Sequence, residues 1–243
     1  MSISDQNIYT SNISFGILGK FHGYNFMYRF EPDYNGKTPD FQLLDFLAKY
    51  IQNIKAANIA DIGAGNGRNA FPVSKYVNSL TAFEQSRVAR SVLKNKAPSN
   101  NLFVSDKDIT KDNFFYPANF DAVYMTHVTQ HFIDKELVTT FQNLKNTIKR
   151  KGLLVFDALI WDSNPKNRIA TIRNAKNGNQ SFCQKDLLEV ARSQGFSLVD
   201  TCNYEESGLS RAFYIDKGVW GGSDKNDKTK YPVKLKWFVF RLD

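Results

Sequence analysis

The segment from Ile59 to Ala70 reads IADIGAGNGRNA, an apolar run that passes into a glycine-rich turn. Gly63, Gly65 and Gly67 allow sharp bends and a close ligand approach, because glycine has no Cβ. A helix after such a turn directs its free backbone N–H groups at the ligand. The segment therefore predicts a strand, a turn and a helix that form a nucleotide site at one end of an open α/β sheet.

The spacing of the glycines distinguishes two kinds of nucleotide site. A dinucleotide fingerprint has the pattern G-x-G-x-x-G, whose third glycine lets the helix pack closely against the strand. Here the pattern is D-x-G-x-G-x-G, with Asp61 before the turn and Arg68 directly after it. It resembles the first motif of class I S-adenosylmethionine (SAM)-dependent methyltransferases. The resemblance implies that the methionine end of SAM is held by Asp61, Gly63, Gly65, Gly67 and Arg68.

An acidic residue follows the second predicted strand, which covers residues 80–83. Glu84 lies 21 positions after Gly63, close to the spacing of about 20 expected for a ribose-binding acid. A carboxylate there can accept hydrogen bonds from both ribose hydroxyls. We therefore expect Glu84, with Gln85 beside it, to bind the ribose; a solvent-facing Glu that starts a loop is the alternative.

The third predicted strand, residues 102–105, ends among acids. Class I methyltransferases often place an acid here that accepts from the adenine amino group, followed by an apolar residue that covers the ring. The resemblance assigns these roles to Asp108 and Ile109, with Asp106 as a competing candidate for the acid. A polar loop without a ligand role is the alternative.

Further strands are expected at residues 120–126, 153–158, 196–204 and 234–242. Their order and spacing resemble the class I fold over residues 56–200, which implies an α/β, Rossmann-like fold with a seven-stranded, mostly parallel sheet. In this fold the last strand runs antiparallel between the fifth and sixth. Helices are expected at residues 40–54, 67–77, 85–96, 134–149 and 182–191, with Asp40 as a possible N-cap of the first and Gly195 as a C-cap of the last.

The length of 243 residues suits one domain. We expect residues 1–40 to be a lead-in that lies over the cofactor, residues 163–180 to be a loop or short helix over the pocket mouth, and residues 205–231 to be an insertion before the last strand. Tyr28 in the lead-in is a candidate pocket residue, although its ring could equally pack the outer helix layer.

Composition limits the partners of the chain. The net charge of +8 could indicate nucleic acid, but dispersed surface charge is the simpler explanation, and we expect no nucleic acid. No run of about 18 apolar residues predicts a membrane span, and no apolar signal segment stands at the N-terminus. Two cysteines give neither a disulfide framework nor a zinc site. We expect a cytoplasmic protein without a metal.

Methyl transfer depends mainly on positioning of the acceptor, with a base where the acceptor must lose a proton. His131 follows the fourth strand and is the best candidate for substrate contact or catalysis, since histidine titrates near neutral pH; a cap of the next helix is the alternative. Thr126 and His127 are expected to border the sulfonium, and the His127 backbone could matter more than its ring. Asp157 could orient a substrate amine or bond to loop amides.

Two motifs that are typical of nucleobase methyltransferases are absent from the sequence. No Asp-Pro-Pro-Tyr-like motif of adenine-amine methylases and no Pro-Cys of cytosine-C5 enzymes is present. The segments GNGRN at residues 65–69 and THV at residues 126–128 resemble the tellurite-resistance type of methyltransferase. The segment HFID at residues 131–134, with Lys151-Gly152, resembles the protein N-terminal amine type, although Ala158 stands where that type has Asn. We expect a SAM-dependent methyltransferase for a small molecule or peptide. The alternatives are a SAM-binding regulatory protein without turnover and an RNA-directed enzyme.

Overall fold

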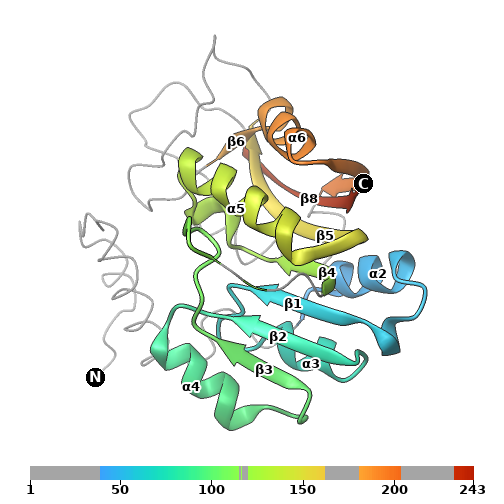
Figure 1. The fold of residues 1–243 in the computed structure, drawn as a ribbon, viewed down its shortest axis with the longest axis vertical. Coiled ribbons are helices and arrows are strands. Elements are labelled where there is room, and N and C mark those ends of the chain that lie inside the picture. Colours follow the sequence, from blue (N-terminus) through green and yellow to red (C-terminus); the bar gives the residue numbers. More distant parts are fainter. Residues whose placement is uncertain (1–38, 115, 117–119, 162–180, 204–232) are drawn as a thin grey trace, which may run out of the picture.

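The computed structural model describes residues 39–114, 116, 120–161, 181–203 and 233–243, and its strands form one sheet covered by helices on both faces (Figure 1). The strands are β1 (Asn58–Ile62), β2 (Ser79–Phe83), β3 (Leu102–Ser105), β4 (Phe120–Met125), β5 (Ile148–Trp161), β6 (Phe182–Cys183), β7 (Phe196–Asn203) and β8 (Val233–Leu242). The helices are α2 (Phe41–Tyr50), α3 (Ala70–Ser74), α4 (Arg87–Lys96), α5 (Asp134–Thr147) and α6 (Gln184–Ser193), with 3₁₀ turns η2 (Ile54–Ala56) and η3 (Thr129–His131).

The sheet has the strand order β3-β2-β1-β4-β5-β8-β7. Strands β3, β2, β1, β4 and β5 are parallel, and β8 runs antiparallel between β5 and β7. The predicted α/β fold and the antiparallel position of the last strand are therefore confirmed. The two-residue strand β6, which pairs with β5, adds an eighth strand that the sequence did not predict.

Alternate residues of the central strands supply two hydrophobic cores, one on each face of the sheet. Ile59 packs in the core beneath α2 and α3, whereas its neighbour Ala60 belongs to the core beneath α5 and α6. Side chains that follow one another in a strand point to opposite faces, so a sheet buried on both sides requires apolar residues at nearly every position. This requirement accounts for the continuous apolar runs in the sequence.

Helix α3 is much shorter than the predicted 67–77 segment. Gly67 has φ +97°, which lies outside the helical region, and regular helix begins only at Ala70. Helix α4 begins at Arg87 rather than at Gln85, because the Ser86 hydroxyl accepts the Ala89 N–H and so caps the helix. In the same way, the predicted 182–191 helix begins with the β6 residues and becomes helical only at Gln184.

Asp40 stands at the N-cap position of α2, but its side chain makes no capping hydrogen bond. The predicted N-cap position is therefore confirmed, although the carboxylate contacts Arg68 of the glycine-rich turn, as described below, and not the first turn of the helix. Gly195 follows α6 with φ +85°, so the predicted end of this helix is confirmed. The lead-in with Tyr28, the 163–180 segment and the 205–231 insertion lie outside the described residues.

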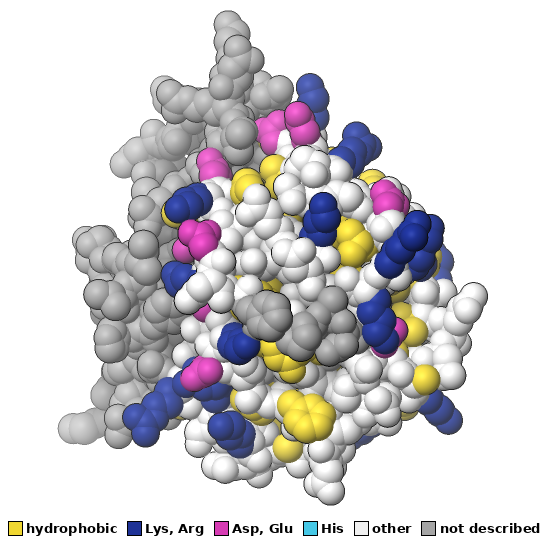
Figure 2. Space-filling view, in the orientation of Figure 1, with side chains coloured by type: hydrophobic (Ala, Val, Ile, Leu, Met, Phe, Trp, Pro, Cys, Tyr) yellow, Lys and Arg dark blue, Asp and Glu magenta, His cyan; other side chains and the backbone are white. Residues whose placement is uncertain are grey.

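Lys and Arg side chains are dispersed over the face of the molecule shown in Figure 2, and several lie beside Asp or Glu. Among the described residues, ion pairs join Lys49 to Asp200 at 3.0 Å and Lys149 to Asp121 at 2.8 Å. None of the helices in the described ranges is both long and apolar enough to cross a membrane.

Candidate functional site

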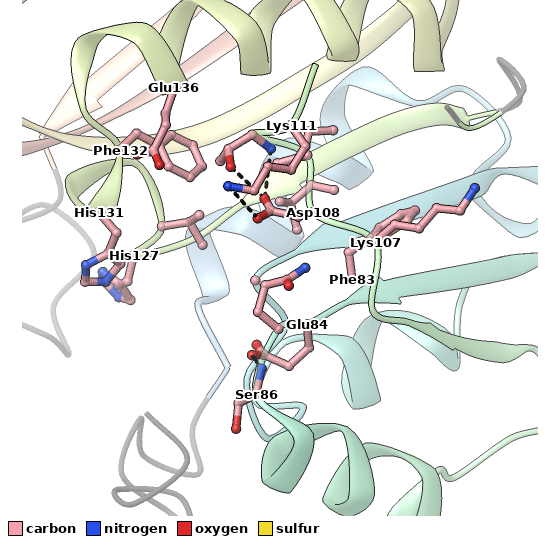
Figure 3. A pocket seen from close by; sticks show the side chains of 16 residues that line it. Phe83, Glu84, Ser86, Lys107, Asp108, Lys111, His127, His131, Phe132 and Glu136 are labelled. Carbon is pink, nitrogen blue, oxygen red and sulfur yellow. Dashed lines mark hydrogen bonds and ion pairs between the residues drawn. The ribbon is translucent and has the colours of Figure 1, made fainter. Parts of the chain in front are cut away.

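A cavity of about 170 Å³ opens where the carboxyl ends of β1 and β2 meet the segments that follow β3 and β4 (Figure 3). Its apolar wall includes Phe83, Val128 and Phe132, and its polar wall includes acids, lysines and two histidines. This end of a parallel sheet is where open α/β folds bind their ligands. The lining comes from segments well separated in the sequence, so only the fold brings these residues together.

The glycine-rich turn after β1 depends on left-handed backbone at three positions, with φ +72° at Gly63, +57° at Gly65 and +97° at Gly67. A Cβ at Gly63 would also collide with Cγ2 of Val128. The turn is fixed to the next strand, because the Gly63 and Ala64 N–H groups both donate to the Phe83 carbonyl, at 2.8 and 3.1 Å. The glycines therefore place the turn directly against the ends of β2 and β4.

Glu84 follows β2 and lines the cavity, with only 8% of its surface exposed. Its two carboxylate oxygens accept the Gly65 N–H at 2.7 Å and the Ser86 N–H at 2.6 Å. Burial raises the pKa of this carboxyl, and the two N–H donors oppose the rise. The carboxylate is thus held by the glycine-rich turn on one side and by the start of α4 on the other.

The two acids after β3 occupy different places. Asp108 lines the cavity, and its Oδ1 accepts from the N–H and the hydroxyl of Thr110 at 2.9 and 2.7 Å. Ile109 beside it is buried and also lines the cavity. Asp106 does not line the cavity; its side chain is 75% exposed and lies 4.0 Å from Arg90. The geometry therefore favours Asp108 over Asp106 as the acid that meets a ligand.

Asp61 is buried at the end of β1, behind the cavity wall. Burial raises the pKa of its carboxyl to about 8, and the hydroxyl of the equally buried Tyr124 opposes this rise. The negative charge of Glu84 contributes to the elevated value. Asp61 therefore lies within the protein beside Tyr124 and does not line the cavity.

A buried polar network connects the start of α2 to the glycine-rich turn. Arg68 donates to both oxygens of Asp40, at 3.1 and 2.7 Å. Asn69 donates from Nδ2 to Asp40 and to the Thr126 hydroxyl, both at 2.9 Å, and accepts the Asp40 N–H at 2.9 Å. Arg68 and Thr126 thus join α2, the turn and the end of β4, and neither lines the cavity.

His127 follows β4 and lines the cavity. Its N–H donates to Oδ1 of Asp157 at 2.7 Å, and its ring Nδ1 lies 3.1 Å from Oδ2 of the same carboxyl. Burial lowers the pKa of His127 to about 4 and raises that of Asp157 well above its ordinary value. Asp157 is fully buried, so it contacts His127 rather than a substrate amine.

His131 ends the 3₁₀ turn η3 and lines the cavity near His127 (Figure 3). Its alternative role as a cap of α5 is wrong. The N-cap position of α5 belongs to Ile133, and Glu136 accepts the Ile133 N–H at 3.0 Å. His131 therefore lies one short turn before the helix, on the cavity side.

Most, but not all, of the predicted site residues line the cavity. It is lined by the predicted residues Gly63, Glu84, Gln85, Asp108, Ile109, His127 and His131. Asp61, Gly65, Gly67, Arg68 and Thr126 surround it without lining it, and Tyr28 is not described. Lys107, Lys111, Val128, Phe132 and Glu136 line it without having been predicted. Their closeness to Asp108 and His131 in the sequence was the available signal.

Residues 60–156 match the family model described as a methyltransferase domain. This part of the chain is a methyltransferase domain. This match runs from β1 to the middle of β5 and so includes the glycine-rich turn and the acids and histidines that line the cavity. No curated protein matches the sequence.

Solved structures share the fold of the methyltransferase at low sequence identity. The [4+2]-cyclase SpnF is 16% identical, with a TM-score of 0.66 over 92% of this chain and 95% of its own. Geranyl diphosphate C-methyltransferase from Streptomyces coelicolor A3(2) is 12% identical, with a TM-score of 0.63 over 84% and 78%. A TehB-like SAM-dependent methyltransferase from Corynebacterium glutamicum is 14% identical, with a TM-score of 0.59 over 93% and 100%. These identities establish the fold alone.

The cofactor of the methyltransferase domain is SAM, and the cavity fits it chemically. Two carboxylates at successive strand ends, Glu84 and Asp108, offer acceptors for hydroxyl and amino groups, and Ile109, Val128 and Phe132 offer apolar surface for a ring. Among the residues described here, no group of three His, Cys, Asp or Glu side chains is arranged to hold a metal ion.

Proposed function

We propose that this chain transfers a methyl group from SAM to a small-molecule or peptide acceptor. The observation that carries the proposal is the meeting of Glu84, Asp108 and His131 in one cavity, from the ends of three different strand–loop units. The two acids can accept hydrogen bonds from the hydroxyl and amino groups of a nucleoside. The histidine can contact a second reactant. SAM supplies a methyl group already activated by the positive charge on its sulfur.

Each part of the cavity has its own proposed role. Glu84 and Gln85 bind the ribose hydroxyls, and Asp108 accepts from the adenine amino group while Ile109 covers the ring. The methionine end lies along the turn that contains Gly63, Gly65 and Gly67. Arg68 and Thr126 act indirectly, because they join the turn, the start of α2 and the end of β4 without lining the cavity, and Asp61 is buried in β1 just before the turn.

The histidines are proposed to face the acceptor. His127 and His131 both line the cavity, and Figure 3 draws them to one side of Glu84 and Asp108. Rate enhancement would come mainly from holding the acceptor atom in line with the methyl carbon. Tyr28 from the lead-in stays a candidate for the same side of the pocket.

A small molecule is the favoured acceptor. Phe83, Phe132 and Val128 give the cavity an apolar wall, and the basic side chains in Figure 2 are dispersed rather than joined in one band. Both features suit a compact substrate better than RNA. The likeness to a [4+2]-cyclase keeps a SAM-binding protein without methyl transfer as the second candidate.

Calorimetric titration with S-adenosylhomocysteine (SAH) tests the cofactor site directly, with NAD as the control ligand. Micromolar binding of SAH together with no binding of NAD is the expected result. Equal binding of both, or of neither, would contradict the proposed site. A panel of small amines, phenols and thiols with labelled SAM then separates methyl transfer from cofactor binding alone.

A further inference from the structure

Asp157 is an acidic residue in the buried interior of the sheet. It lies in β5 between Phe156 and Ala158, and all three residues are fully buried. Phe156 and Ala158 belong to the hydrophobic core beneath α5 and α6. An acidic side chain is costly to bury unless it forms hydrogen bonds, so packing alone does not account for a carboxyl here. The hydrogen bonds of Asp157 therefore indicate what this residue does.

The carboxyl of Asp157 binds the segment that follows β4, at the point where the pairing of β4 with β5 ends. The two strands pair as far as Met125 and Phe156, and β5 continues to Trp161. One residue past the last pair, Oδ1 of Asp157 accepts the backbone N–H of His127 at 2.7 Å. The side chain therefore extends the contact between the two segments beyond the end of β4.

The backbone at His127 requires contacts of this kind. Its φ is +58°, in the left-handed region that residues with a Cβ seldom adopt. Gln130 donates to the carbonyl of His127, and the Thr129 hydroxyl donates to the carbonyl of Asp157 at 2.6 Å. Strained backbone persists only where the surrounding structure holds it. Asp157 thus holds this loop through both its side chain and its backbone.

The residue after the left-handed position forms part of the cavity wall. Val128 lies directly against Gly63, because a Cβ added to Gly63 would collide with Cγ2 of Val128. Gly63, His127 and Val128 all line the cavity. The backbone conformation at His127 therefore determines where Val128 lies relative to the glycine-rich turn, and with it the shape of the cavity between them.

We propose that Asp157 is a positioning residue of the cofactor site, whose carboxyl holds His127 in the left-handed conformation and thereby places Val128 against Gly63. This inference rests on the proposed assignment of the cavity to SAM. In this role Asp157 contacts no ligand and changes ligand affinity through the backbone of His127. The imidazole ring of His127 is not needed for the effect.

The hydrogen bond between Asp157 and His127 does not require a negative charge. Burial raises the pKa of the Asp157 carboxyl well above its ordinary value, and the His127 N–H opposes this rise. The charge of Asp40 adds to the rise, and that of Arg68 opposes it. A neutral carboxyl still accepts through an oxygen. Asparagine, which is neutral and has the same shape, should therefore replace Asp157 with little loss.

The first test examines the loop by NMR in the protein without SAM, so it does not depend on the proposed function. In the wild type, a nuclear Overhauser effect should connect a γ-methyl group of Val128 to an α-hydrogen of Gly63. We expect Asp157→Ala to weaken this signal and Asp157→Asn to retain it. Asp157→Leu, which fills the space that alanine leaves, repeats the comparison if the alanine variant does not fold.

The matched control for this test is Asp121→Ala. It removes another carboxyl that accepts a backbone N–H from a neighbouring strand, at 2.8 Å from Asn58, but near the start of β4 rather than after its end. The control should retain the signal between Val128 and Gly63. An unchanged signal in a folded variant that lacks an oxygen at residue 157 would overturn the inference.

The second test uses SAH affinity in double-mutant cycles to separate the backbone of His127 from its ring. We expect Asp157→Ala to weaken SAH binding by roughly 5- to 30-fold, because the ligand alone must then hold the left-handed backbone. The same factor should appear in the His127→Ala background, which lacks the ring but retains the Cβ. It should fall to about twofold or less in the His127→Gly background, because glycine adopts positive φ without strain.

Any other pattern of losses overturns the inference. Equal suppression of the Asp157→Ala effect by His127→Ala and by His127→Gly would assign the effect to the ring. A loss in Asp157→Asn as large as that in Asp157→Ala would show that the hydrogen bond to the backbone is not the cause. Failure of the wild type to bind SAH would instead refute the proposed function, and the NMR comparison would still decide what places Val128.

Discussion

Arg68 donates from two guanidinium nitrogens to the two carboxylate oxygens of Asp40, at 3.1 and 2.7 Å. The side chains are only 10% and 7% exposed, so the pair is buried between the start of α2 and the glycine-rich turn. A bidentate contact of this kind fixes the relative orientation of the two segments as well as the distance between them. Arg68, which the sequence predicted to contact the cofactor, therefore lies between α2 and the glycine-rich turn and does not line the cavity.

Removing the guanidinium should destabilise the fold, because the Asp40 carboxylate would remain buried without its main partner. We expect Arg68→Ala to lower the free energy of unfolding by about 3–5 kcal/mol, measured by urea denaturation. Lys149→Ala, which breaks the exposed contact with Asp121, is the control and should cost about 1 kcal/mol or less. Equal losses in the two variants would contradict a buried role for Arg68.

Glu84→Gln tests the proposed ribose contact with almost no change of shape. An amide can accept through one oxygen only, so one of the two N–H bonds from Gly65 and Ser86 would be lost along with the charge. We expect SAH affinity to fall at least tenfold, which is about 1.4 kcal/mol, by calorimetry. Asp106→Asn, at an exposed acid outside the cavity, serves for comparison and should bind as the wild type does.

Substitutions at two glycines with positive φ allow the stability cost of backbone strain to be measured separately from the cost of a steric collision. Gly195→Ala should cost about 1–2 kcal/mol for the left-handed conformation alone, since its nearest neighbour, Leu242, lies 3.8 Å from the added Cβ. Gly63→Ala should cost about 1–3 kcal/mol more, because its Cβ also meets Val128. Thermal denaturation measures both. Val128→Ala in the Gly63→Ala background should recover part of the loss; no recovery would mean that the collision is not the cause.

Asp61 should make stability fall as pH rises. Its folded pKa of about 8 exceeds its ordinary value of 3.8, so the folded protein holds a proton that the unfolded chain has lost between these values. The contribution is complete below pH 3.8 and disappears as pH rises through about 8. Asp61→Asn should show a smaller decrease between pH 5 and pH 8 than the wild type in urea denaturation; parallel curves would argue against the elevated pKa.

His131→Ala should slow methyl transfer without weakening SAH binding, because the nucleoside is assigned to the cavity acids and His131 is assigned to the acceptor. We expect a fall in kcat of about 10- to 100-fold, at or below the lower end of acid–base effects. Steady-state kinetics and calorimetry on the same preparation separate the two parameters. Full activity would remove His131 from the list of substrate-side residues.

The sequence predicted the sheet well because its strands are apolar runs that end at glycine or acidic residues. Glu84 and Asp108 each follow such a run, and both line the cavity. Helix limits were less predictable. The start of α3 depends on the backbone conformation of Gly67, and a periodic pattern of apolar residues does not report where a left-handed residue interrupts it.

The polar network could not be predicted, because its members lie far apart in the sequence and contain ordinary residue types. Asp40 and Asn69 are 29 positions apart, and His127 and Asp157 are 30 apart. Asp40 looked like a helix cap, since a cap and an ion-pair partner require the same side chain at the same place. Only the packing of α2 against the turn decides between the two roles.

The position of β8 has a consequence for the order in which the protein can be made. Strand β8 is the last described element, yet it lies between β5 and β7 and pairs with both. A ribosome therefore delivers β7 before the strand that connects it to the rest of the sheet exists. Until residues 233–242 leave the exit tunnel, the ring of Phe156 lacks the cover of Phe238 and Phe240. The nascent chain should thus depend on chaperones most strongly before β8 has emerged.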